Sequence, residues 1–531
     1  MTRIQPAARQ SPASCRPPEV PAKGRRKTGD MTRIQPAVRQ SPASCRPPEV
    51  PAKGRRKIPL LQAFLLLFAL LFASPAAADP FGPRFVGGLD PGIPTHVANT
   101  GIYTNPAVIG RLKTNTAVFH FSPMFQTLDI DRATIDSSTG LPDPAGDMAF
   151  PNVNITHNLL DFYVGFTTNF GMDRITLGLA FFAPQRQELH TKHPALRYHL
   201  VDRSIANYFL TPALSVKLHR KFHAGFGLSY AFSTFDITMT RDRYLRGDLP
   251  DTAPQHYEAG GDNDEKVHAA GTDNNFGFHF GFLWQLDKFI FLAGSYRSKI
   301  RALDYTQIKA DGSGSISRVT TEDGPITLSG NAKLVTTFPD TANLGIVRRF
   351  SRDWWFDATI TWTRWGAHKN WKYYLSGREL ANSNLTNWDL NITEYRGFQD
   401  TFSPQMTAFY RPTTGFEAII SLRYGPPAVP EKWVNASAVD NHAIEALFSV
   451  SYQITDFLTA RLGYALEYMI PLNVNESGYD PSAAQACLDS HIDVVWSEAC
   501  RATYGGRALP TAAGEYRKVT HQIGLGLEFK F

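Results

Sequence analysis

Apolar and polar residues alternate with a period of two along much of this chain. In the last eleven residues, HQIGLGLEFKF, an apolar side chain stands at every second position from Ile523 to Phe531. The segment NFGFHFGFLWQL, residues 275–286, repeats the pattern with Phe at four alternate positions before Trp284. This period is typical of a β-strand with one apolar face and one polar face. The chain is therefore predicted to consist largely of amphipathic strands.

The alternating segments predict fourteen strands, and short and long connections between them follow each other in alternation. The predicted strands cover residues 114–129, 161–170, 175–184, 203–218, 223–241, 275–286, 289–304, 340–350, 355–366, 398–411, 416–424, 441–454, 458–469 and 521–531. Tight turns are predicted at 171–174, 219–222, 287–288, 351–354, 412–415 and 455–457. Long polar connections are predicted at 242–274, 305–339 and 470–520. Short periplasmic turns and long outer loops are typical of a bacterial outer-membrane barrel.

Aromatic residues gather toward the ends of the predicted strands, as at Tyr230 with Phe232 and at Tyr464 with Tyr468. A soluble β-sandwich also alternates, but its apolar face packs on a second sheet and can be aliphatic throughout. Aromatic girdles at both lipid–water boundaries indicate a membrane barrel instead. A closed barrel also pairs every backbone N–H and C=O within lipid and leaves no edge strand.

The closing strand would then place Phe531 at the periplasmic rim. Outer-membrane barrels commonly end on an aromatic residue that the barrel assembly machinery reads, and this chain resembles them at that position. The sequence therefore predicts an all-β protein, a fourteen-stranded antiparallel transmembrane β-barrel integral to the bacterial outer membrane. Outer-membrane lipid and the assembly machinery are the expected partners of its surface.

The front of the chain differs in composition from the rest. Residues 1–27 and 31–57 repeat one basic, Pro-rich sequence with a single difference. Such a tract cannot bury a core, so residues 1–57 are predicted to be a disordered or wrongly included leader, with Met31 as the candidate start. Residues 58–78 follow the basic Arg55, Arg56 and Lys57 and combine a short apolar run with small residues, which predicts a secretory signal peptide. A membrane anchor is the alternative, but a spanning helix needs about 20 apolar residues.

Without this leader the net charge changes sign. Residues 1–78 contain 14 Lys and Arg and 3 Asp and Glu, so the remaining 40 basic and 45 acidic residues give a net charge of −5. The high overall pI is then no argument for nucleic-acid binding. Cys487 and Cys500 remain in the last long loop and are candidates for a disulfide. Because no CxxC, HExxH or Cys/His cluster occurs, neither a metal nor a cofactor is predicted. His219 and His223 flank a tight turn and are expected to be solvated.

Four stretches occur in an order that resembles a known family. They are TNPAVIG at 104–110, YRS at 296–298 after a tight turn, FPDTANLGIVRRFSRDWWFDATITWTRW at 338–365, and LFSVSYQITDFLTARLGYALEY at 447–468. Together they resemble the FadL family of outer-membrane transporters for long-chain fatty acids and other hydrophobic compounds, such as aromatic hydrocarbons. The resemblance implies a fourteen-stranded barrel with a small hatch in its lumen, and it matches the independent strand count.

The resemblance gives the motif Asn105, Pro106 and Ala107 a role in that hatch. Residues 79–113 are rich in Gly and Pro, which suits compact irregular backbone inside a barrel. The plain alternative is a tether before the first strand. Residues 114–531 are expected to form the barrel itself.

Several charged residues fall on the strand faces opposite the apolar stripes, among them Arg423 and Arg461. A charge that faces hydrocarbon at mid-depth costs about 2–4 kcal/mol, so these side chains are predicted to point inward. One interpretation is a structural network of ion pairs that lines the wall. The other is that Arg423 or Arg461 meets a carboxylate of the ligand.

The predicted function is passive transport of hydrophobic small molecules through a hatch-plugged barrel that acts as a monomer. An outer-membrane enzyme of the lipase or protease type is an alternative, but it requires a Ser/His pair or paired carboxylates at one strand edge. No such constellation is evident in the sequence, so the chain is not expected to be an enzyme. A general porin or an adhesin is a further alternative, and a general porin has no hatch.

Overall fold

The computed structural model describes residues 85–136, 142–147, 149–191, 193–242, 264–300, 308–320, 324–367, 370–382, 390–412, 415–475 and 512–531. The predicted leader and signal peptide lie outside these residues, and so do Cys487 and Cys500. No helix in the described ranges is long and apolar enough to cross a membrane.

Fourteen antiparallel strands close into a barrel, because β1 pairs with β2 on one side and with β19 on the other. The wall strands are β1 (Thr116–Arg132), β2 (Val153–Thr168), β3 (Ile175–His190), β4 (Asp202–His219), β5 (Phe222–Asp242), β6 (Asp264–Gln285), β7 (Ile290–Arg297), β10 (Thr341–Arg349), β11 (Trp354–Thr363), β14 (Thr401–Tyr410), β15 (Phe416–Gly425), β16 (Ala443–Gln453), β17 (Leu458–Met469) and β19 (Gly514–Lys530). Each predicted strand corresponds to one of them, so the predicted fold class is confirmed.

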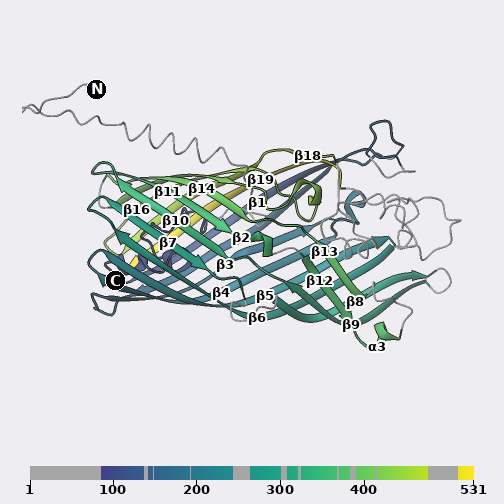
Figure 1. The fold of residues 1–531 in the computed structure, drawn as a ribbon, viewed down its shortest axis with the longest axis horizontal. Coiled ribbons are helices and arrows are strands. Elements are labelled where there is room, and N and C mark those ends of the chain that lie inside the picture. The colour runs from purple at the N-terminus through teal and green to yellow at the C-terminus, as the bar shows by residue number, and fades with distance from the viewer. Residues whose placement is uncertain are drawn as a thin grey trace, which may run out of the picture. The chain divides into compact units, whose positions relative to one another are not determined.

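The alternation in the sequence sorts side chains between the two faces of the wall. In β19, Leu525 is 50% exposed on the outer face, whereas Gln522 is fully buried on the inner one. Strand β6 behaves in the same way, with Phe280 outside and His279 inside. Large apolar side chains thus cover the outer surface that faces lipid, whereas polar side chains and a cluster of buried apolar ones lie inside the barrel. The predicted tight turns at 171–174, 219–222, 287–288, 351–354 and 455–457 are confirmed and lie at the same end as the C-terminus (Figure 1). The predicted turn at 412–415 lies partly outside the described residues.

The strands reach further at the opposite end than the sequence analysis predicted. Five additional strands lie there: β8 (Ile308–Thr320), β9 (Gly324–Thr336), β12 (Asn370–Ser376), β13 (Asn391–Tyr395) and β18 (Leu472–Val474). The prediction of a long loop at 305–339 was therefore wrong, because its described residues form β8 and β9, which pair with each other and with β6 and β12 respectively. Its sequence lacks the apolar stripe because strands beyond the lipid need no hydrophobic outer face.

The described helices are single turns. They are α2 (Gly101–Thr104), η1 (Val108–Arg111), η2 (Pro194–Leu196), η4 (Trp365–Ala367), α3 (Arg378–Ala381) and η5 (Glu431–Trp433). Helices α2 and η1 belong to residues 85–113, which we term the luminal segment. This segment touches inward-facing side chains of wall strands on several sides of the barrel, so it lies in the lumen.

Candidate ligand cavity and luminal segment

The motif at Asn105 holds the luminal segment to the wall and fixes its turn. The side-chain amide of Asn105 donates to the carbonyls of Pro94, at 2.8 Å, and of Phe282 on β6, at 3.0 Å. Its carbonyl oxygen accepts from the backbone N–H of Ala107 at 3.0 Å. Asn105 and Ala107 are fully buried. One amide side chain therefore binds three backbone groups at once and ties the luminal segment to β6.

Glycines on the inner face of the wall make room for this turn. A Cβ at Gly225 on β5 would lie 2.2 Å from the backbone nitrogen of Ala107, and one at Gly281 on β6 would lie 2.1 Å from the Asn105 side chain. Real side chains essentially never approach that closely. The small residues that separate the aromatic ones in the strand pattern are thus required where the luminal backbone meets the wall.

A buried charged pair anchors the first half of the luminal segment. The His96 ring lies 2.7 Å from the Asp90 carboxylate and 3.8 Å from that of Glu417 on β15. Burial alone would lower the pKa of His96, but the Asp90 carboxylate reverses this effect and raises the pKa to about 9. Burial alone would likewise raise the pKa of Asp90, whereas His96 lowers it to about 2. Both groups are therefore ionised at neutral pH, and Glu417 attracts the imidazolium toward the wall.

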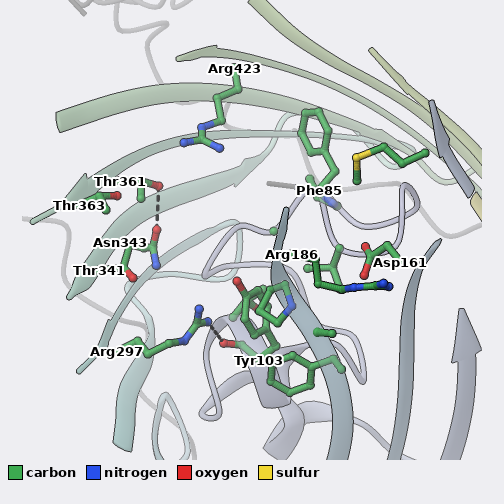
Figure 2. Close-up of a pocket in the computed structure, with 18 of the residues that line it drawn as sticks. Phe85, Tyr103, Asp161, Arg186, Arg297, Thr341, Asn343, Thr361, Thr363 and Arg423 are labelled. Carbon is green, nitrogen blue, oxygen red and sulfur yellow. Dashed lines mark hydrogen bonds between the residues drawn. The ribbon is translucent and has the colours of Figure 1, made fainter. Parts of the chain in front are cut away.

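The main cavity has a volume of about 120 Å³ and lies between the luminal segment and the wall (Figure 2). Its apolar lining includes Phe85 and Tyr103 from the luminal segment and Phe162 and Phe182 from the wall. Its polar lining comprises Thr104, Asp161, Arg186, Arg297, Thr341, Asn343, Thr361, Thr363, Gln405 and Arg423. The cavity therefore combines aromatic surfaces with several positioned polar groups, as ligand sites commonly do.

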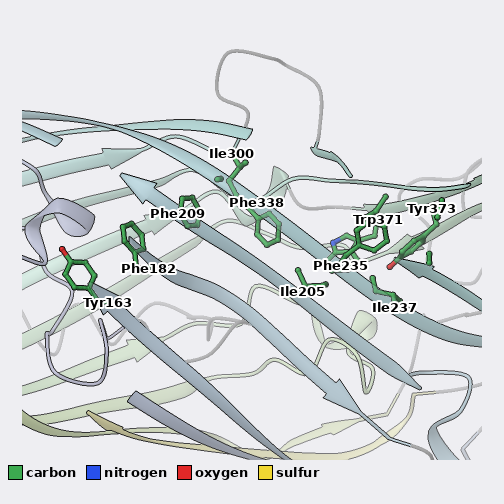
Figure 3. Close-up of a cluster of buried hydrophobic side chains, with 14 of the residues drawn as sticks. Tyr163, Phe182, Ile205, Phe209, Phe235, Ile237, Ile300, Phe338, Trp371 and Tyr373 are labelled. Carbon is green, nitrogen blue, oxygen red and sulfur yellow. The ribbon is translucent and has the colours of Figure 1, made fainter. Parts of the chain in front are cut away.

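A smaller pocket of about 20 Å³ shares Tyr103, Phe182 and Arg297 with the main cavity. It is also lined by Phe209 and Phe338, which belong to a large cluster of buried apolar side chains. Figure 3 shows this cluster extending along the barrel, from the side chains beside the luminal segment to those of the strands at the far end. We term it the apolar track; its members include Tyr163, Phe182, Ile205, Phe209, Phe235, Ile237, Ile300, Phe338, Trp371 and Tyr373.

The wall is incomplete beside the main cavity. Strand β2 pairs with β1 from Thr167 to Val153, but it pairs with β3 only from Thr168 to Tyr163. The register between β3 and β4 shifts just past Phe182, where Pro184 supplies no backbone N–H to a ladder. The cavity lining includes residues of both strands at this break. A binding site inside the barrel thus adjoins an opening in the hydrogen-bond ladder of its wall.

The predicted inward charges lie on the inner face of the wall and form ion pairs. Arg423 lies 3.4 Å from Glu445, and Arg461 lies 2.5 Å from Glu528. Lys518, which the sequence analysis did not single out, lies 2.8 Å from Glu467. Arg423 lines the main cavity, whereas Arg461 lines neither of the two cavities described above. A role for either arginine in ligand binding remains a prediction.

The sequence analysis missed several residues that the fold brings to the cavity or the luminal segment. His223 was expected to be solvated, but it is buried on the inner face of β5 against Gly110. Asp90 and His96 gave no signal, because nothing in the sequence shows that they pair. Arg297 occurred within the YRS stretch of the family resemblance, and its inward direction follows from the alternation of β7. The strand period could therefore have identified Arg297 as a luminal cation.

A closed fourteen-stranded barrel with an apolar outer face, an occupied lumen and a cavity beside a wall opening defines an integral outer-membrane transport barrel. The family model described as outer membrane protein transport protein (OMPP1/FadL/TodX) matches residues 96–494. The chain therefore belongs to the FadL family, which confirms the resemblance seen in the sequence. A comparison with curated proteins found none that matches this chain.

Solved structures show the same fold at low sequence identity. A FadL homologue from Pseudomonas aeruginosa aligns with a TM-score of 0.65 and 13% identity, over 86% of this chain and 100% of that one. The toluene transporter TodX from P. putida aligns with a TM-score of 0.56 and 11% identity, over 85% and 99%. The toluene transporter TbuX from Ralstonia pickettii gives 0.52 and 12%, over 85% and 100%.

Proposed function

We propose that this barrel carries compact aromatic compounds passively across the outer membrane and releases them sideways through the break between β2 and β3. The observation that carries the proposal is the position of the main cavity. It meets the luminal segment on one side and the incomplete ladder on the other. A molecule held there can leave toward the lipid without passing the luminal segment.

The size of the cavity favours a single aromatic ring. Its volume of about 120 Å³ is comparable to the cavity of ~150 Å³ that holds benzene in an engineered protein. Two of the structurally similar proteins are toluene transporters, and another is a monoaromatic hydrocarbon channel. Burial of apolar ligand surface yields about 25 cal/mol per Å², so a ring can bind mainly through the aromatic lining.

The apolar track supplies the entry route in this proposal. It leads from the strands beyond the lipid, where Trp371 and Tyr373 lie, to Phe182 at the cavity (Figure 3). A hydrophobic molecule would move along it from the outer end toward the luminal segment. The luminal segment would act as the hatch, with Asn105, Pro106 and Ala107 at its fixed turn, and keep the lumen closed to ions.

The other predictions on partners and chemistry remain part of this proposal. The barrel would act as a monomer, surrounded by outer-membrane lipid and inserted by the assembly machinery. It would act as a transporter and not as an enzyme, because the buried polar groups described above hold the luminal segment or pair within the wall. A general porin would show a large, permanently open conductance.

Uptake of labelled toluene by cells that lack other such barrels tests the proposal. Ala183 lines the cavity beside the break and is 3% exposed. Ala183→Trp would fill this space and exclude the ligand; a loss of about 1 kcal/mol of ligand binding already lowers occupancy about fivefold, so we expect uptake to fall at least that much. Leu218→Trp is the control, because Leu218 lies on the outer face and is 65% exposed. An unmodified barrel that conducts ions like an open porin and gives no uptake above cells without it would refute the proposal.

A further inference from the structure

The connection between β15 and β16 turns into the barrel at the end opposite the tight turns. Within residues 426–441 only Glu431 is exposed, and every residue from Trp433 to Asn441 is buried. Connections usually run over the surface of a protein, because a buried one carries backbone polar groups that need partners. Residues 426–441 are therefore packed against the rest of the fold, and we term them the mouth segment.

The mouth segment is a compact unit with hydrogen bonds of its own. The Asp440 carboxylate accepts from the backbone N–H groups of Ala428, at 2.6 Å, and of Val429, at 3.1 Å, which joins the two ends of the segment. The Asn435 side chain accepts from the backbone N–H of Ser437 at 2.9 Å. A second buried apolar cluster, shared with β1, β2 and the β3–β4 connection, includes Ala428, Val429, Trp433, Val434, Ala436 and Val439 of the segment.

Ser437 connects the mouth segment to the far side of the barrel. Strand β4 lies about halfway round the ring of wall strands from β16, yet Arg203 on β4 donates to the Ser437 carbonyl at 3.0 Å. The Ser437 hydroxyl donates to Glu394 on β13 at 3.1 Å. Arg203 also donates to both carboxylate oxygens of Glu394 at 3.0 Å, and it is buried. The segment thus crosses the outer mouth and is fastened there to a buried ion pair.

This ion pair lies at the outer end of the apolar track, which Trp371 and Tyr373 mark (Figure 3). The guanidinium groups of Arg203 and Arg396 lie 4.9 Å and 4.3 Å from the centre of the Trp371 ring. The Tyr373 hydroxyl donates to Glu394 at 3.3 Å, and Arg396 lies 2.9 Å from the same carboxylate. Trp371 and Tyr373 are each only 1% exposed, so the track is shut off from the outside at this point.

The mouth segment is the part of this closure that can move. Strands β4, β12 and β13 are held by continuous ladders of backbone hydrogen bonds. The described residues of the mouth segment join no such ladder, and the isolated bridge between Asn435 and Ala438 lies within the segment itself. Regions held by few hydrogen bonds open at a lower free-energy cost than paired strands do. Glu394 keeps Arg203 and Arg396 as partners when Ser437 leaves, so opening strands no buried charge.

We propose that the mouth segment is an outer lid, latched by the contacts of Ser437 with Arg203 and Glu394, and that this lid opens to admit a hydrophobic molecule to the apolar track. The lid and the luminal segment then close the two ends of the track. A molecule passes the lid at the outer end and leaves through the β2–β3 break, so no continuous path for ions forms. The inference rests on the proposed function, since it concerns entry to the same cavity.

Labelling of a thiol beneath the lid measures lid opening directly. Ile205 lies two residues beyond Arg203 on the same inner face of β4 and is buried, so Ile205→Cys supplies the thiol. The barrel carries Cys487→Ser and Cys500→Ser, and a small methanethiosulfonate reagent is added to intact cells. The rate of labelling then reports how often the lid uncovers the outer part of the track.

Arg203→Met should speed this labelling at least about tenfold, because the closed lid loses a charge-assisted hydrogen bond. Arg517→Met is the matched control, because Arg517 pairs with Glu515 at 2.6 Å at the same end of the barrel but is 57% exposed. Equal labelling rates in the Arg203→Met, Arg517→Met and unmodified barrels would overturn the latch.

Fixing the lid shows whether molecules pass beneath it. Arg203→Cys and Ser437→Cys, joined by a reducible bifunctional thiol reagent, tie the lid to β4 in place of the latch. Uptake of labelled toluene should fall to the level of cells without the barrel and return after reduction. A joined barrel that takes up toluene as fast as the reduced one would show that molecules enter by another route.

The outcomes separate the two proposals. If the unmodified barrel takes up toluene but neither the labelling rate nor the joined cysteines have the expected effect, the lid is wrong and the proposed transport stands. If Arg203→Met speeds labelling but no barrel takes up toluene, the latch stands and the proposed function fails. If Arg203→Met does not assemble, Ser437→Ala, which removes only the hydroxyl contacts, should speed labelling about fivefold, and an unchanged rate would reject the latch.

Discussion

Replacing Asn105 by Ala should open the barrel to ions without unfolding it. The substitution removes the donor to the Phe282 carbonyl, which ties the luminal segment to β6. It also removes the two contacts, with Pro94 and Ala107, that shape the turn. Asn105, Pro94 and Ala107 are buried and Phe282 is half-buried, so these partners have little access to bulk water when they lose Asn105.

The magnitude follows from the number of bonds. A neutral hydrogen bond contributes about 1 kcal/mol net, so the wall contact alone accounts for about 1 kcal/mol and all three for about 3 kcal/mol. Each 1.4 kcal/mol changes an equilibrium about tenfold. We therefore expect the ratio of open to closed barrels to rise between about fivefold and 150-fold. The wall ladder does not include Asn105, so the folded barrel should persist.

Single-channel recording in planar bilayers measures this ratio as the open fraction. Heat-modifiable mobility in gel electrophoresis shows independently whether the barrel is folded. Asn154→Ala is the matched control, because Asn154 is an exposed Asn of β2 that contacts only neighbouring wall residues. A folded Asn105→Ala barrel with the same open fraction and the same toluene uptake as the unmodified protein would show that this residue does not hold the lumen closed.

Three further predictions concern the charged anchor, the wall glycines and the outer loop. The pKa of His96 is about 9 with the luminal segment in place and the ordinary 6.5 once the segment is displaced. Protonated His96 therefore stabilises the closed barrel by about 3 kcal/mol below pH 6.5, and this stabilisation is lost as the pH rises through 9. The open fraction should increase over this pH range, and His96→Gln should abolish the increase. Gly225→Val should displace the luminal backbone by steric clash and raise the conductance of a folded barrel, and unchanged recordings would contradict the close packing. Cys487 and Cys500 should form a disulfide on the oxidising outer side, which adds roughly 3 kcal/mol, and non-reducing peptide mapping that finds two free thiols would reject it.

The period of two was sufficient to predict the wall of this barrel. Every second residue of a spanning strand faces lipid and must be apolar, as Phe276 and Phe280 of β6 are. This requirement applies to each residue separately, so it can be recognised in the sequence without knowledge of the strand's partners. The tight turns were predictable for the same reason, because they interrupt the period over a few residues. Strands β8 and β9 were missed, since they lie beyond the lipid and carry no such stripe.

Other features were decided only by the tertiary structure. The break between β2 and β3 and the register shift between β3 and β4 near Pro184 are properties of strand pairing, which alternation along one strand cannot reveal. Asn105 reaches a backbone carbonyl of the wall 177 residues away along the chain, and Arg297 reaches one of the luminal segment 194 residues away. Sequence indicates that such polar side chains point inward, because a charge or amide in lipid is costly. Which group each one meets is set by the closure of the barrel around the luminal segment, where distant strands come within hydrogen-bonding distance of one short stretch of backbone.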